Sequence, residues 1–184
     1  MMPGSKRKPI VLSYNHIRDA ICSICDKEDR FMLAVAYANG CRVGEIVQVM
    51  AEDIEIKGDF VYVATPVLKK RARFVPKRAP PIYRKLEGWL ADIVLGYAEG
   101  KQGWLVSYGI RTAQRRFEKY FECTSHSFRH TRATHCFTLF GMSMREVAEF
   151  FMISEKALAD WCMRYGHLER SALEKRMIGL EEFE

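Results

Sequence analysis

His126 and Arg129 lie three residues apart, and their side chains are of types that could carry out chemistry together. They follow Thr124 and Ser125, both good N-caps of a helix. Residues three apart share a helical face, so we expect the imidazole and the guanidinium side by side near the positive end of a helix dipole. Such a face suits a phosphate group. An isolated His-x-x-Arg can also be a solvated surface pair, so other motifs must show whether this pair binds phosphate.

Basic residues are concentrated in three parts of the chain. The formal net charge is +6 and the isoelectric point is about 9.0. Lys and Arg gather at residues 6–8, 69–78 and 111–119, so the polyanion that fits best is nucleic acid, bound through its phosphates. The arginines expected to contact DNA are Arg71, Arg73, Arg111, Arg115, Arg116 and Arg132.

Length and composition indicate a globular protein inside a cell. The chain has 184 residues, of which 48% are hydrophobic and 28% charged, enough for one domain with a real core. It has no apolar run that could cross a bilayer and no secretory signal. We therefore expect a cytoplasmic protein with no membrane partner, in the host cell if its source is viral.

The cysteines do not indicate a disulfide framework, because most lie in apolar, periodic segments that favour reduced thiols. Cys22 and Cys25 form the one metal-like spacing, and a zinc-stabilised adaptor is an alternative that needs two further ligands. No phosphate-binding glycine loop and no paired carboxylate site is present. We therefore expect no metal, nucleotide or other cofactor.

Hydrophobic periodicity predicts an α+β fold that is mainly α. After residue 53 the spacing of apolar residues changes from a helical period of 3.6 residues to a strand period of two. This change predicts a hairpin of residues 54–56 and 60–63. Residues 73–76 are predicted to complete a small three-stranded antiparallel sheet, which the following prolines end. Helices are expected over about residues 14–26, 31–38, 43–50, 82–93, 110–120, 124–140, 143–152, 154–165 and 168–184.

Three separate stretches match one known pattern. Residues 39–45, Asn-Gly-Cys-Arg-Val-Gly-Glu, are similar to T-G-x-R-(I/V)-x-E, and residues 126–131, His-Ser-Phe-Arg-His-Thr, to H-x-L-R-H-(S/T). Residues 163–168, Met-Arg-Tyr-Gly-His-Leu, are similar to R-Y-x-H-(L/V). Residues 73–76 resemble the R-x-V-P that closes a lysine-bearing hairpin. The chain thus resembles the catalytic domain of the tyrosine recombinase, or phage integrase, family, and within it the integrases of archaeal viruses and plasmids.

The resemblance implies a site-specific recombinase or integrase that cleaves and rejoins DNA through a 3′-phosphotyrosyl intermediate, as in viral genome integration. It makes Tyr165 the nucleophile, because a phenolate can store the energy of the broken phosphodiester as a phosphotyrosine. Arg42 and Arg129 would hold the non-bridging oxygens through forked hydrogen bonds. His126 would be the base for the attacking phenol.

The leaving 5′ oxygen would take its proton from a lysine on the hairpin loop. Lys69 is the first candidate and Lys70 a close competitor. Arg42 could instead be only an ion-pair partner of Glu45, and in either case Glu45 could orient it. The residues whose roles stay open are Glu45, Lys70, His130, Lys156 and His167.

One departure from the family pattern precedes the nucleophile. The family carries Leu-Gly-His, or Trp in place of the His, about nine residues before its tyrosine, whereas residues 151–156 here are Phe-Met-Ile-Ser-Glu-Lys. Lys156 stands at that sequence distance and Ile153 matches by local context. Loss of this hydrogen-bond donor is expected to weaken catalysis without abolishing it.

The resemblance also sets the expected domain organisation and partners. Residues 1–13 are interpreted as a disordered arm or a remnant of cloning, and residues 14–184 as the catalytic domain, without the family's N-terminal core-binding domain. The expected partner is double-stranded DNA with a specific recombination site, bound by a homotetramer that is a monomer or weak oligomer when free. The alternatives are a type IB topoisomerase and a catalytically decayed DNA-binding module.

Overall fold

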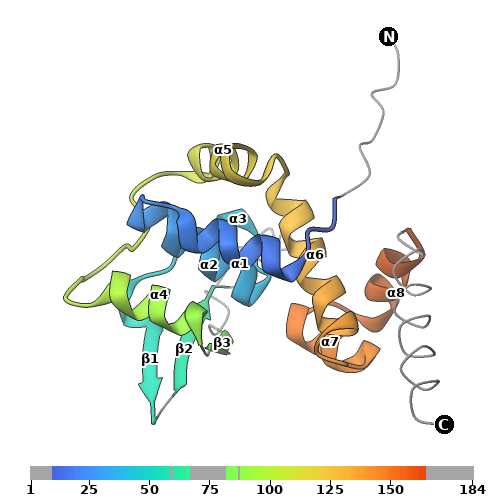
Figure 1. The fold of residues 1–184 in the computed structure, drawn as a ribbon. Helices are drawn as coiled ribbons and strands as arrows, with labels where there is room; N and C mark the ends of the chain where they lie inside the picture. The colour runs from blue at the N-terminus through green and yellow to red at the C-terminus, as the bar shows by residue number, and fades with distance from the viewer. Residues whose placement is uncertain (1–9, 59, 67–81, 87, 165–184) are drawn as a thin grey trace, which may run out of the picture. The chain divides into compact units, whose positions relative to one another are not determined.

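The computed structural model describes residues 10–58, 60–66, 82–86 and 88–164 (Figure 1). Backbone contacts divide the chain into two compact units, Met1–Thr131 and Arg132–Glu184. Helix α6, Ser125–Thr138, runs across this boundary. Each unit has its own hydrophobic core.

Helix α2 is the central element of the first unit. It begins after Asp26, whose carboxylate accepts a hydrogen bond from the Asp29 backbone N–H at 2.9 Å, and it ends at Gly40. Residues 31–39 are all buried, because other helices of this unit and strands of the sheet cover α2. The helices of this unit before α6 are α1 (Tyr14–Ser23), α2 (Lys27–Asn39), α3 (Val43–Ile46), α4 (Trp89–Ala98) and α5 (Ile110–Phe121).

A three-stranded antiparallel sheet with the order β1-β2-β3 accompanies these helices (Figure 1). Its strands are β1 (Ile54–Lys57), β2 (Phe60–Thr65) and β3 (Ile82–Leu86). Strand β2 pairs along one edge with β1, with Ile54 opposite Val63, and along the other with β3. The alternation of residues 54–63 thus predicted the hairpin correctly.

The third strand of the described sheet, β3, comes from a segment that was predicted to be helical. Residues 73–76, predicted to be the third strand, lie outside the described part of the chain. Residues 82–86 were expected to begin a helix, which instead starts at Trp89. Pairing with β2 decides the conformation of this short segment, because isolated propensity is weak beside non-local strand pairing.

Helix α3 is shorter than predicted. It ends at Ile46 instead of continuing to residue 50. The chain then pairs with the segment before α5, since Leu105 N–H donates to the Val49 carbonyl at 3.0 Å and Ala51 N–H to the Gly103 carbonyl at 2.8 Å. These bonds satisfy backbone groups that a longer helix would have used.

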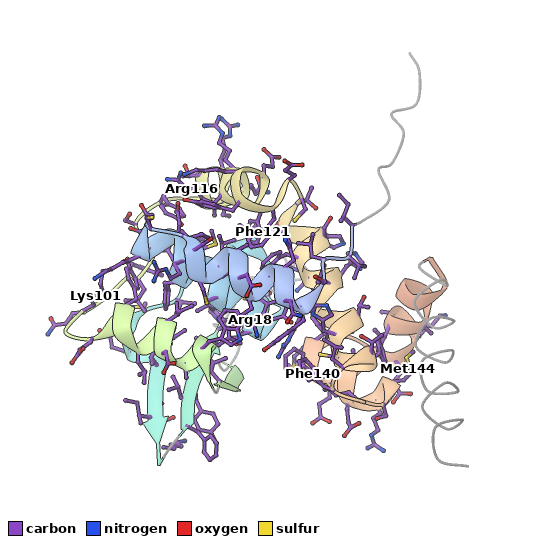
Figure 2. The ribbon with its side chains drawn as sticks, in the orientation of Figure 1. Arg18, Lys101, Arg116, Phe121, Phe140 and Met144 are labelled. Carbon is purple, nitrogen blue, oxygen red and sulfur yellow. The ribbon has the colours of Figure 1, made fainter. Side chains whose placement is uncertain are left out.

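Aromatic packing fixes the start of α6 against α5. The ring of Phe128, which is 1% exposed, lies 5.2 Å from the ring of Phe117 and 4.7 Å from that of Phe121, centroid to centroid. Figure 2 labels Phe121. Tyr37 of α2 approaches the ring of Phe128 at 6.0 Å. Because Phe128 lies between His126 and Arg129 in sequence, this cluster sets how the first turns of α6 are oriented.

The second unit contains the end of α6 with α7 (Met144–Phe151) and α8 (Glu155–Arg164). Ser143 and Glu146 form the predicted capping box, with Ser143 N–H donating to the Glu146 carboxylate at 2.7 Å. The core of this unit includes Cys136, Val147 and Leu158. The fold class is confirmed as mainly helical with a small antiparallel sheet. Of the helices described, none has the length and apolar character to span a bilayer.

Candidate active site

Arg42 stands at the start of α3 and is oriented by Glu45. One Glu45 carboxylate oxygen accepts a hydrogen bond from the Arg42 backbone N–H at 2.7 Å, and the other pairs with Arg42 Nη1 at 3.2 Å. The Glu45 side chain is 6% exposed, whereas that of Arg42 is 56% exposed. Glu45 therefore holds Arg42 while leaving most of its guanidinium open to another anion.

Arg129 is held by the turn that carries Arg42. Its guanidinium is almost fully buried, and Nη1 donates to the carbonyl oxygen of Gly40. Gly40 ends α2 in the left-handed conformation, with φ 54°, which glycine adopts without steric cost. Only Cys41 separates Gly40 from Arg42 along the chain, so the same turn positions Arg42 and accepts a hydrogen bond from Arg129. Arg129 is thus not a solvated surface residue.

Two imidazoles lie one helical turn apart at the start of α6. Thr124 caps the helix by accepting a hydrogen bond from Ser127 N–H at 3.1 Å, as the sequence predicted. The rings of His126 and His130 meet edge to face, with centroids 4.6 Å apart and planes at 82°. His126 is exposed and His130 is 3% exposed, so only the first ring is open to a ligand from solvent.

Burial and positive charge keep both imidazoles neutral. The pKa of His126 is lowered by partial burial and by the nearby guanidiniums of Arg129 and Arg42. The pKa of His130 is lowered to about 3, mainly by burial and further by His126 and Arg129. A neutral His126 can accept a proton at physiological pH, because its ring nitrogen is not already protonated.

Arg42, Arg129 and His126 therefore form one site in the first unit. Two guanidiniums can hold the non-bridging oxygens of a phosphodiester, and a neutral imidazole beside them can accept a proton. The backbone carbonyl of Gly40 is a part of this site that the sequence did not reveal. The Asn-Gly pair signalled the helix end, but it carried no sign that the carbonyl faces Arg129.

The arginines expected to contact DNA fall into two groups. Arg111 and Arg115 of α5 are exposed. Arg116 instead pairs through Nε with the buried carboxylate of Asp29 at 3.0 Å, and Arg132 lies over the rings of Phe140 and Phe150 at 4.9 and 5.6 Å. Several other expected site residues lie outside the described part of the chain: Tyr165, Lys69, Lys70, Arg71, Arg73 and His167.

The end of α7 helps to align residues 151–156 with the Leu-Gly-His pattern that the family carries before its tyrosine. Met152 ends this helix in the left-handed conformation, with φ 53° and ψ 47°, which a glycine would favour. The Leu-Gly-His pattern therefore aligns with Phe151-Met152-Ile153, which favours Ile153 over the exposed Lys156 as the residue at that position. An isoleucine side chain has no hydrogen-bond donor.

The cysteine pair does not gather further metal ligands within the described residues. Cys22 and Cys25 are both exposed free thiols. Across residues 10–58, 60–66, 82–86 and 88–164, no three His, Cys, Asp or Glu side chains come together as a metal site would require.

Comparison with known proteins extends the motif evidence to most of the chain. The model of the phage integrase family matches residues 13–157. The matched range contains Arg42, His126 and Arg129 and ends before Tyr165. A search of curated proteins found no match.

Solved recombinases share the fold. XerA recombinase is 17% identical with a TM-score of 0.67, over 97% of this chain and 66% of that protein. XerH site-specific recombinase bound to difH substrate, in a pre-cleavage complex, is 15% identical with a TM-score of 0.65, over 89% and 52%. XerH in a post-cleavage complex with palindromic difH substrate is 14% identical with a TM-score of 0.66, over 92% of this chain and 52% of that protein. This chain thus spans about half to two thirds of the length of these recombinases. With the match to the family model over residues 13–157, the chain belongs to the phage integrase family.

Proposed function

We propose that this chain is the catalytic part of a site-specific DNA recombinase, or integrase, that cleaves and rejoins DNA through a 3′-phosphotyrosyl intermediate. One observation carries the proposal. The turn after α2 and the first turns of α6, 89 residues apart in the chain, bring Arg42, Arg129 and His126 together. These are the side chains that a phosphoryl transfer to tyrosine requires.

The two arginines stabilise the transition state. Negative charge grows on the non-bridging oxygens as the attacking and leaving oxygens share the phosphorus, and fixed guanidiniums lower the energy of that charge. Arg129 is fixed by the Gly40 carbonyl and Arg42 by Glu45. Because both are held before DNA binds, little reorganisation is needed when the reaction occurs.

The protons balance across one cleavage step. The phenolic oxygen of Tyr165 bonds to phosphorus and gives its proton to His126, while the bond from phosphorus to the 5′ oxygen breaks. Lys69, or Lys70, protonates that leaving oxygen. The products are a 3′-phosphotyrosine and a free 5′ hydroxyl, and the reverse steps rejoin the strand. A neutral His126, whose pKa is lowered, supports its role as the acceptor.

The proposed partner is double-stranded DNA with a specific recombination site, bound by a homotetramer that acts in the cytoplasm. XerH, which shares the fold, was solved on a difH substrate before and after cleavage. The proposed domain comprises residues 14–184 and follows a short N-terminal arm. The net charge of +6 supports binding to DNA phosphates.

The test is to trap the covalent intermediate. The protein is incubated with nicked duplexes of randomised sequence, designed so that cleavage releases a short 5′-hydroxyl fragment and rejoining is prevented. We expect a protein–DNA adduct on a denaturing gel, and we expect it to form equally well when EDTA is present during the reaction. Tyr165→Phe should give no adduct. Sequencing of the trapped DNA then reveals the preferred site.

One observation favours a second candidate, a decayed DNA-binding module. Ile153, a candidate for the position where the family carries a hydrogen-bond donor, has no donor in its side chain. Retained DNA binding without any adduct would support this candidate and contradict the recombinase. An adduct with relaxation of supercoils, but without exchange between two sites, would instead indicate a type IB topoisomerase.

A further inference from the structure

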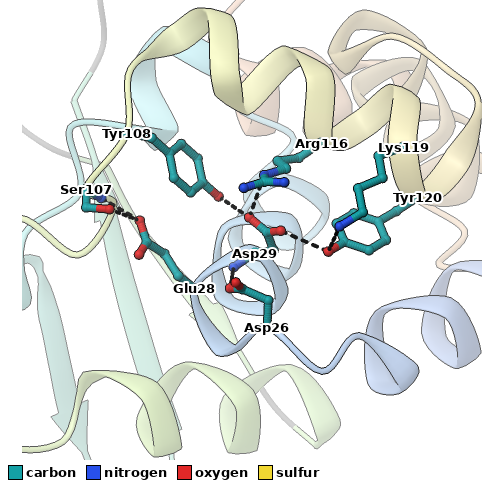
Figure 3. Close-up of polar contacts among 8 residues, drawn as sticks. All are labelled: Asp26, Glu28, Asp29, Ser107, Tyr108, Arg116, Lys119 and Tyr120. Atoms are coloured by element: carbon teal, nitrogen blue, oxygen red, sulfur yellow. Dashed lines mark hydrogen bonds and ion pairs between the residues drawn. The ribbon is translucent and has the colours of Figure 1, made fainter.

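A buried polar cluster ties α5 to α2 through Asp29 (Figure 3). The Asp29 carboxylate, 1% exposed, accepts hydrogen bonds from the Tyr108 hydroxyl at 2.8 Å and the Tyr120 hydroxyl at 2.9 Å. It also pairs with Arg116 Nε at 3.0 Å. Asp29 lies in the first turn of α2, whereas Arg116 and Tyr120 belong to α5. We call these four residues the Asp29 cluster.

The Asp29 cluster restrains α5 at both of its ends. Tyr108 precedes the helix and Tyr120 lies in its last turn. Burial and the hydrogen bond to Asp29 raise the pKa of Tyr108, so its hydroxyl stays a donor. Next to it, Glu28 accepts hydrogen bonds from the backbone N–H and the hydroxyl of Ser107, at 2.6 and 2.7 Å. The segment entering α5 and the end of the helix are thus both tied to α2.

This orientation turns three basic side chains of α5 to solvent. Arg111, Arg115 and Lys119 are four residues apart in succession, so they lie along one face of the helix, and all three are exposed. We call them the basic stripe. Arg116, one residue after Arg115, is turned about 100° away and faces Asp29 (Figures 2 and 3). Lys119 Nζ also donates to the Tyr120 oxygen at 2.9 Å, which links the stripe to the Asp29 cluster.

We propose that Asp29 is a positioning residue that fixes the rotation of α5 through Tyr108 and Tyr120 and so presents the basic stripe to the phosphates of duplex DNA. Arg116 supplies the charge that keeps the carboxylate in the core, and it does not contact DNA. The inference rests on the proposed function, since it names the surface that a DNA-acting protein would use.

The first test is the salt dependence of DNA binding by the full chain. Fluorescence anisotropy with a labelled 30-base-pair duplex of arbitrary sequence gives the slope of log K against log salt concentration, which counts phosphate contacts. We expect Arg115→Gln to reduce the slope by about 1 and Arg116→Gln to leave it unchanged. Lys57→Gln, on a strand across the unit from α5 (Figure 1), is the charge-matched control and should not change it. An equal loss with Arg116→Gln, in a variant in which Arg115→Gln still reduces the slope by about 1, would overturn the inference.

The second test separates positioning from mere stability. In the Tyr108→Phe/Tyr120→Phe background, which keeps all charges, Arg115→Gln should reduce the slope much less than in the wild type, because the stripe is no longer held in place. Strictly additive effects would overturn positioning. If the double variant does not fold by circular dichroism, Tyr120→Phe alone serves in the same cycle.

The two proposals fail in different ways. A wild-type chain that does not bind the duplex at low salt would overturn the proposed function, and the inference with it. Binding that is salt-dependent but insensitive to Arg111→Gln, Arg115→Gln and Lys119→Gln would overturn only the inference.

Discussion

Two carboxylate–arginine pairs in the first unit are built alike but leave their arginines with different freedom. Glu45 pairs with Arg42 at 3.2 Å and Asp29 pairs with Arg116 at 3.0 Å, and both carboxylates are buried. The Arg42 side chain remains 56% exposed, whereas that of Arg116 is 31% exposed. Glu45 also accepts from a backbone N–H, while Asp29 accepts from two tyrosine hydroxyls.

The contrast shows why a carboxylate beside an arginine does not by itself decide that arginine's role. Glu45 pairs with one terminal nitrogen of Arg42, Nη1, and the Arg42 side chain stays 56% exposed, so the rest of its guanidinium can still receive a phosphate. Asp29 draws Arg116 toward the core, where its charge neutralises a carboxylate that would otherwise be costly to bury. The first pair is suited to catalysis and the second to holding α5.

The largest expected effect concerns Arg42. Arg42→Gln should slow adduct formation about 100-fold to 1,000-fold, as when one donor to a developing negative charge is lost. The melting temperature should fall only modestly, because the Arg42 side chain is mostly exposed and Glu45 still accepts a hydrogen bond from the backbone N–H of residue 42. Arg18→Gln is the matched control, since Arg18 is also exposed and paired with an acidic neighbour. An Arg42→Gln variant with wild-type adduct rates would remove Arg42 from the site.

Arg116 should give the opposite pattern. Arg116→Met leaves the buried Asp29 without its cation, and the free energy of unfolding should fall by about 3 kcal/mol, the lower end for a broken buried pair because two hydroxyls remain. Urea unfolding measures this loss. Arg18→Met, at a solvated pair, should change the same quantity by less than about 0.5 kcal/mol. Similar small losses for both variants would show that the Asp29 pair is energetically no different from a surface pair.

Gly40 extends the comparison to an arginine that is held by the backbone, because Arg129 donates to the Gly40 carbonyl and not to a carboxylate. Gly40→Ala should cost about 1–2 kcal/mol of stability at φ 54°. It should also slow adduct formation about tenfold, the effect of about 1.4 kcal/mol on the barrier, as the carbonyl shifts from Arg129. Gly58→Ala is the matched control, because Gly58 has φ 58° in the hairpin turn and touches no site residue. Equal adduct rates for the two variants would separate Gly40 from catalysis.

The sequence predicted what depends on local signals. The capped start of α6, the capping box before α7 and the β1–β2 hairpin each have a short-range cause, and each was found near its predicted position. The grouping of Arg42, Arg129 and His126 came from the family resemblance, since no local signal links residues so far apart.

Long-range partners explain what the sequence did not predict. Ile82, Leu86 and Trp89 are spaced as on a helix, yet β3 forms because β2 offers an open edge. Arg116 appeared equivalent to Arg115 in a basic helix. Arg116 differs from Arg115 because it pairs with Asp29. Asp29 also accepts hydrogen bonds from the hydroxyls of Tyr108 and Tyr120, which lie 79 and 91 positions further along the chain.

The effect that depends on pH concerns the two imidazoles beside Arg129, which repeat the contrast between an exposed and a buried group. The pKa of His130 is about 3 in the folded state and about 6.5 when unfolded, so between these values the unfolded chain binds more protons. Stability contributed by neutral His130 is therefore complete above pH 6.5 and is lost as the pH falls toward 3, by up to about 1.4 kcal/mol per pH unit. His130→Phe keeps an aromatic ring but cannot titrate, so its stability should depend less on pH between 6.5 and 4.5. His126→Phe, at the exposed ring, should flatten the curve less. Urea unfolding at several pH values measures both, and curves parallel to the wild type for His130→Phe would show that this ring is not held neutral by the fold.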